Sequence, residues 1–112
     1  MKQRTKTFAL RVIKLINSLP ENLVCRRLGD QLLRSGTSVA SNYRAVCRAR
    51  SKADFISKLG IVEEEADESA LWMELLIESG VVSQARLGKL LDEANQLTAI
   101  TVASRKKASC PH

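Results

Sequence analysis

Residues 28–46 read LGDQLLRSGTSVASNYRAV and carry the clearest structural signal in this sequence of 112 residues. Apolar or small side chains recur there at the four-and-three spacing of one helix face. The positions are Leu28, Leu32, Ser35, Val39, Asn42 and Val46. The repeat runs unbroken through Arg34-Ser35-Gly36-Thr37-Ser38, which local propensity would assign to a loop. We therefore predict one long helix over about residues 21–48.

Small residues follow one flank of this predicted helix, at Gly29, Gly36 and Ala40. A neighbouring helix can approach closely where side chains are this small. The alternative is that the small residues only relieve crowding inside a bundle. The sequence leaves both interpretations open.

Three further segments have helical periodicity. The first carries its apolar stripe over residues 8–19 and is broken at Pro20. The next runs from an N-cap at Ser51 to a C-cap at Gly80. The last begins at Ser83 or Gln84 and keeps an apolar face as far as Thr101.

Four amphipathic helices with short connections favour an all-α fold, an antiparallel up-down-up-down four-helix bundle. We expect two long central helices and two shorter outer ones, so the central pair should protrude or be covered by another subunit. Residues 1–104 form the expected bundle domain. Residues 105–112 lack an apolar pattern and are predicted to be a basic, flexible tail.

The charge is distributed unevenly along the chain. Residues 1–58 carry 13 Lys and Arg against 3 Asp and Glu, a net charge of +10. Residues 59–112 carry 5 against 9, a net charge of −4, which gives the overall +6. A basic half suggests an anionic partner such as nucleic acid.

Composition argues against several other classes. Three cysteines without a Cys-x-x-Cys spacing argue against a disulfide framework and a zinc site, and a reducing cytoplasm is the expected location. Arg11 and Lys14 interrupt the apolar run that a signal peptide needs, and no stretch is apolar enough to span a membrane.

No catalytic constellation is visible in the sequence. The one histidine, His112, ends the chain, so a Ser-His or Cys-His nucleophile has no base within the expected bundle. Glycines suited to a phosphate loop are missing, and the carboxylates near Glu65 lack the Glu-x-x-His pattern of a di-metal site. We expect a non-enzymatic protein without a metal or cofactor.

The basic residues suggest a surface that binds nucleic-acid phosphates. Arg26, Arg44 and Arg48 share one arc of the long helix, opposite its core stripe. The candidate site is completed by residues of the next connection and of the first helix: Arg50, Lys52, Lys14 and Arg11. Few aromatics are available for base stacking, so recognition should be weakly sequence-specific. The alternative is an ordinary solvated face.

A second candidate surface lies on the segment between Ser51 and Gly80. Off its core stripe, one face gathers Ile61, Glu65, Glu68, Trp72 and Leu75. We interpret this face as a subunit interface, with the two acids meeting arginines of a neighbouring copy. The alternative is that the first or last helix of the same bundle covers Trp72.

Residues 31–44, QLLRSGTSVASNYR, resemble a hallmark segment of the proteins named for open reading frames in 23S rRNA intervening sequences. Residues 48–59, RARSKADFISKL, are similar to the same family, as are Glu65-Ala66, Glu68-Ser69 and Leu71-Trp72. The resemblance covers about residues 8–100. One departure is Ala45, where the family usually has Glu shortly after the residue equivalent to Asn42.

The resemblance implies a four-helix bundle assembled into a ring-shaped homo-oligomer, typically a pentamer. It also implies a distant relation to the accessory protein of diversity-generating retroelements, whose basic ring works with a reverse transcriptase and nucleic acid. We therefore expect an oligomeric accessory factor that binds RNA or DNA. The alternative function is an oligomeric scaffold that docks an acidic protein partner without binding nucleic acid.

Overall fold

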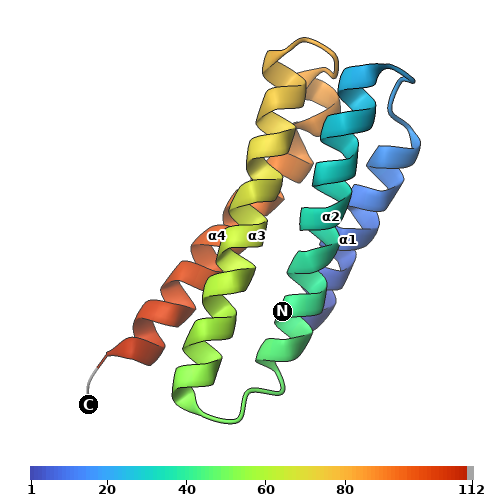
Figure 1. Cartoon of the computed structure of the whole chain (residues 1–112). Coiled ribbons are helices and arrows are strands. Elements are labelled where there is room, and N and C mark those ends of the chain that lie inside the picture. The colour runs from blue at the N-terminus through green and yellow to red at the C-terminus, as the bar shows by residue number, and fades with distance from the viewer. Residues whose placement is uncertain (111–112) are drawn as a thin grey trace.

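A computed structural model describes residues 1–110 of the chain as four α-helices. They are α1 (Lys2–Asn17), α2 (Leu23–Val46), α3 (Lys52–Glu78) and α4 (Gln84–Ser109). Figure 1 shows them running up and down in turn, with consecutive helices side by side. The fold is thus an antiparallel four-helix bundle, 51 Å long and 20 Å across, as the sequence predicts.

Helix α2 is continuous through residues 34–38, which confirms the prediction made from the apolar repeat. The expected helix lengths are wrong in one respect. Helix α4 has 26 residues, close to the 27 of α3, and only α1 is short, with 16. The lower half of α4 lies beside α3 and away from α1 (Figure 1), and α1 packs mainly on α2.

The predicted tail is also partly wrong, because α4 continues through residues 105–109. Arg105 explains the continuation, since its guanidinium binds the Glu63 carboxylate of α3 at 2.9 Å. The charged end of α4 is therefore held against its neighbour without an apolar stripe. Residues 111–112, which include His112, lie outside the described residues.

The core is built from the stripes that the sequence indicates. Its largest fully buried side chains come from all four helices: Phe8, Val12, Leu32, Val39, Leu59, Val62, Met73, Leu76, Leu87 and Leu97. Burying side chains of this size contributes roughly 1.5–3 kcal/mol each relative to exposure. Hydrophobic burial therefore favours the helices more than their local propensity does.

Local signals fix the helix ends. Asn22, Ser51 and Ser83 each accept a hydrogen bond from a backbone N–H in the first turn of α2, α3 or α4. Beyond α3, Gly80 adopts φ of +82°, a conformation that L-residues avoid. The connection between α3 and α4 is therefore short and closely specified.

The Arg-Ser-Gly-Thr-Ser segment of α2 joins three helices. A Cβ atom added at Gly36 would lie 2.9 Å from Val12 Cγ2, so this glycine permits the close approach of α1. On the α3 side, the buried Ser35 Oγ accepts a hydrogen bond from Ser69 Oγ at 2.8 Å. The expected close approach at a small residue is confirmed, and it explains why a helix of modest propensity forms here.

Arg34 adds ion pairs between α2 and α3. Its guanidinium contacts Glu65 at 3.2 Å and Glu68 at 2.6 Å. The two carboxylates raise the pKa of Arg34 above its ordinary value, chiefly through the hydrogen bond to Glu68. Both acids thus have a partner within their own chain.

Candidate nucleic-acid interface

The ends of α1, α2 and α3 meet at one end of the bundle and enclose two adjoining hollows, which we call the basic groove. The hollow between α2 and α3 measures about 580 Å³, and the one between α1 and α2 about 550 Å³. Ser41 and Arg44 line both hollows and connect them. The cationic residues of the groove are Lys2, Lys6, Arg44, Arg48, Arg50 and Lys58.

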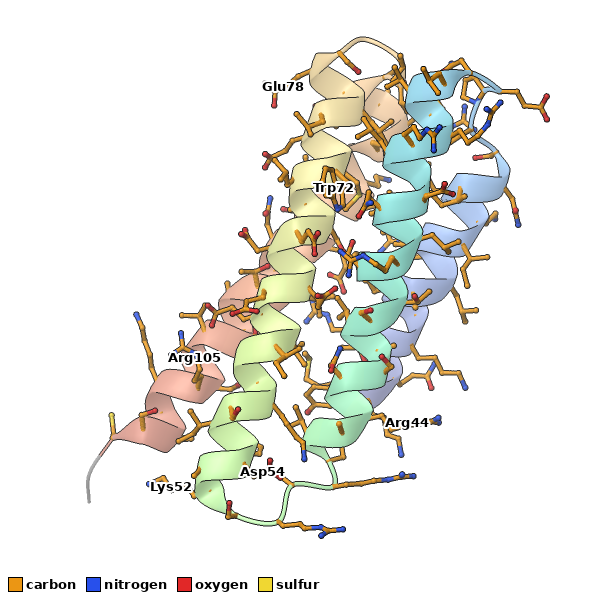
Figure 2. The ribbon with its side chains drawn as sticks, in the orientation of Figure 1. Arg44, Lys52, Asp54, Trp72, Glu78 and Arg105 are labelled. Atoms are coloured by element: carbon orange, nitrogen blue, oxygen red, sulfur yellow. The ribbon has the colours of Figure 1, made fainter. Side chains whose placement is uncertain are left out.

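Two arginines at the end of α2 dominate the centre of the basic groove. Arg44 lies in the last turn of α2 and Arg48 two residues beyond the helix, and both are exposed. Within residues 1–110 neither makes an ion pair. Figure 2 shows Arg44 pointing away from α3 into solvent. Both guanidinium groups are therefore available to an external anion.

One carboxylate, Asp54, lies in the basic groove. Asp54 accepts hydrogen bonds from Lys58 Nζ at 2.8 Å and from the Arg50 backbone N–H at 3.2 Å. These contacts hold the pKa of Asp54 below its ordinary value, and the hydrogen bond from Lys58 has the largest effect. Asp54 is consequently ionised at neutral pH, and six cations face a single negative charge.

Three of the seven predicted nucleic-acid-binding residues come together in the basic groove: Arg44, Arg48 and Arg50. Lys52 begins α3 nearby but lines neither hollow, and Figure 2 shows it on the opposite side of the view from Arg44. Arg26 precedes Arg44 by 18 residues, about 27 Å along a helix, and lines a separate hollow with Glu21 and Asp30.

The predicted residues of α1 also lie elsewhere. Arg11 is close enough to Glu93 of α4 to help lower the pKa of that carboxyl, after the larger effect of Arg4. Lys14 belongs to the last turn of α1, at the far end of the bundle from the basic groove. The position of a basic residue along α1 thus decides whether it reaches the basic groove.

Sequence reasoning did not select Lys2, Lys6 and Lys58 for the site. Lys2 and Lys6 are four residues apart on the face of α1 that meets the end of α2. Lys58 follows Asp54 by one turn and pairs with it. The antiparallel topology could have indicated the first two, because it brings the start of α1 beside the end of α2.

The second predicted surface, on α3, is only partly exposed. Ile61 and Leu75 are 41% and 40% exposed, whereas Glu65 and Glu68 already bind Arg34. Trp72 is half-buried against the core, on the side of α3 toward α2 (Figure 2). Its buried indole N–H has no acceptor among residues 1–110. Trp72 thus packs in part against the core of its own bundle, and its place in a subunit interface stays a prediction.

Tyr43 does not offer a base-stacking surface in the groove. The side chain is half-buried against the core, and this burial, with a smaller contribution from Cys47, raises the pKa of its phenol. No cluster of metal-ligating side chains occurs in the part of the chain that the structure describes. Nor is any described helix both long and apolar enough to cross a membrane.

The fold and the groove define a small helical-bundle protein with a cationic surface at one end. The chain belongs to the family described as 23S rRNA-intervening sequence protein, whose model matches residues 1–103. A crystal structure of a protein of unknown function from the S23 ribosomal protein family of Bacteroides thetaiotaomicron is similar, with a TM-score of 0.83. The two sequences are 31% identical over 94% of this chain and 97% of that one. No functionally curated protein matches the chain.

Proposed function

We propose that this protein is a non-enzymatic factor that binds RNA or DNA phosphates through the basic groove. The observation that carries the proposal is the excess of six cations over one carboxylate in two connected hollows. Arg44 and Arg48, which lack intramolecular partners within residues 1–110, supply the central contacts. Guanidinium groups bind phosphate oxygens in bidentate fashion, which suits them to this role.

The helix termini support anion binding at the same place. Helix α1 begins in the basic groove with no side-chain cap and no acidic residue in its first turn. The positive end of its macrodipole therefore adds to the field of Lys2 and Lys6. The chain as a whole carries a net charge of +6, which attracts polyanions at long range.

The experiment is a salt titration of binding to fluorescent RNA and DNA oligonucleotides of mixed sequence. We expect affinity to fall steeply with salt, with a slope of about −3 to −4 in log–log form if five phosphates are contacted on a single strand. Absence of binding to either nucleic acid at low salt would refute the proposal. Binding of polyglutamate but of neither nucleic acid would instead support the acidic-partner scaffold.

We also propose that the chain assembles into a homo-oligomer through the α3 face. Two aliphatic side chains on one face, Ile61 and Leu75, remain about two-fifths exposed. Burial against a second copy would remove them from water. The five-fold ring and the reverse-transcriptase partner that the resemblance implies stay predictions.

Light scattering tests the assembly at micromolar concentration. We expect a mass above that of the 12.4 kDa chain, reduced to it by I61R combined with L75R. L10R is the matched control, because Leu10 is an exposed leucine of α1 outside the proposed interface. A wild-type chain with the mass of a monomer would contradict the assembly and leave the nucleic-acid proposal untouched.

A further inference from the structure

The two hollows of the basic groove differ in what lines them. The α2–α3 hollow is lined by the charged residues Arg44, Arg48, Arg50, Asp54 and Lys58, with only Ser41 and Ala45 besides. The α1–α2 hollow has an uncharged lining between its cations, made by Gln3 and by the small side chains of Ala9, Thr37, Ala40 and Ser41. The first hollow suits phosphates alone, whereas the second can also take an uncharged, flat group.

The hydroxyl groups of the α1–α2 hollow are already engaged with their own helix. Thr37 Oγ1 donates to the Leu33 carbonyl at 2.8 Å, and Ser41 Oγ donates to the Ser38 carbonyl at 3.3 Å. These hydroxyl groups therefore do not donate a hydrogen bond to a ligand. Ala9 and Ala40 add methyl groups, and Gln3, whose amide donates to Thr7 Oγ1 at 3.4 Å, completes the uncharged lining between the cations.

Cations border this hollow on both helices, Lys2 and Lys6 on α1 and Arg44 on α2. Its volume of about 550 Å³ lies within the roughly 300–1,000 Å³ that is usual for small-ligand sites. A flat uncharged group flanked by negative charges matches this arrangement. A nucleotide within a strand has that character, because its base lies between two phosphates.

Base pairing within the nucleic acid determines whether a base can enter the α1–α2 hollow. In a duplex the bases are stacked inside and the protein meets mainly phosphates and groove edges. In a single strand a base can leave the stack and rest against a protein surface. We propose that the α1–α2 hollow holds one unpaired nucleobase, while Lys2, Lys6 and Arg44 bind the flanking phosphates. The inference rests on the proposed function and adds a preference for single-stranded RNA or DNA.

The test compares three labelled 12-nucleotide probes by fluorescence anisotropy: a single strand, its duplex, and an abasic single strand. We expect wild type to bind the intact single strand about 5-fold or more tightly than the abasic strand, because a base resting against Ala9 and Ala40 is removed from water, and more tightly than the duplex at equal salt. The abasic probe is informative because it keeps every phosphate and removes only the bases.

Variants that fill the hollow distinguish the contribution of the base to affinity from that of the phosphates. A40L adds bulk to the α1–α2 hollow and should reduce the preference for the intact strand to about 1-fold, with affinity for the abasic strand retained. A103L is the matched control, since Ala103 is exposed on α4 and lines neither hollow. If A40L does not fold, as judged by circular dichroism, T37L fills the same hollow from half-buried Thr37.

The outcomes distinguish this inference from the proposed function. Equal affinity of wild type for the intact and abasic strands would overturn the base site and leave phosphate binding standing. An unchanged preference in folded A40L or T37L would overturn it as well. Failure of wild type to bind any of the three probes would remove the proposed function and the inference together.

Discussion

Arg34 and Arg44 occupy the same helix, yet their surroundings differ completely. Arg34 contacts two carboxylates of α3, next to the buried Ser35–Ser69 hydrogen bond and the close approach at Gly36. Arg44 is exposed at the end of α2 and has no ion pair within residues 1–110. The middle of α2 thus holds the bundle together, whereas its end presents free positive charge. Substitutions in the middle of α2 should therefore lower stability, whereas substitutions at its end should weaken nucleic-acid binding.

The largest effect on stability is expected at Gly36. G36V places a β-branched side chain against Val12, where even a Cβ atom would lie 2.9 Å from Cγ2. Overpacking of this kind should destabilise the protein by about 2–3 kcal/mol in urea unfolding. G60A is the control, because nothing lies within 4 Å of a Cβ added there, and it should stabilise by about 0.5–1 kcal/mol. Equal stability of wild type and G36V would contradict the role of Gly36.

A smaller effect is expected when the two arginines are compared directly. R34M leaves Glu65 and Glu68, whose side chains are 18% and 32% exposed, without their partner. We expect R34M to lower the unfolding midpoint measurably, whereas R44M should leave it close to that of wild type. The measurement is the unfolding midpoint of both variants in urea. A larger loss for R44M than for R34M would reverse the comparison.

The smallest effect concerns another paired arginine, Arg4, which binds Glu93 through two contacts of 2.8 Å. Arg4, and then Arg11, hold the pKa of Glu93 below its ordinary value. The stabilisation is therefore present above the unfolded pKa of about 4.3 and is lost as pH falls through the lower folded value. Because the Arg4 side chain is 38% exposed, the contribution should be under about 1 kcal/mol.

Thermal melts at pH 6 and pH 3 measure this effect. E93Q should lower stability at pH 6 and lose less stability than wild type on acidification. R44M should keep the wild-type pH dependence, because Arg44 pairs with no carboxylate in residues 1–110. An identical fall in wild type and E93Q would show that the Arg4–Glu93 pair contributes nothing.

Much of the fold was predictable because apolar periodicity is a local property. The stripe from Leu28 to Val46 predicted a continuous α2, and the caps at Ser51 and Gly80 predicted the limits of α3. The end of α4 was missed, since Arg105 is held by Glu63, a contact between residues 42 positions apart. Charged contacts over such separations leave no periodic signal.

The candidate site was less predictable for a related reason. A helical wheel reports the angle of a residue about the axis, so it grouped Arg26 with Arg44 although they lie at opposite ends of α2. A helical wheel also could not show that Arg34 forms ion pairs with Glu65 and Glu68 of the same chain. Lys2 and Lys6 join the groove only through the packing of α1 on α2.

The most direct test compares two double variants that remove the same charge from opposite ends of α2. R44Q with R48Q removes two of the three arginines that line the basic groove, and R26Q with R27Q removes two exposed arginines from the other end. For a single-stranded oligonucleotide at 0.1 M salt, the groove variant should bind about 10- to 30-fold more weakly, with a salt slope reduced by about 1.4. The variant at the other end should retain most of the wild-type affinity and slope. Equal losses in the two variants would contradict a localised site and leave only the overall positive charge of the chain.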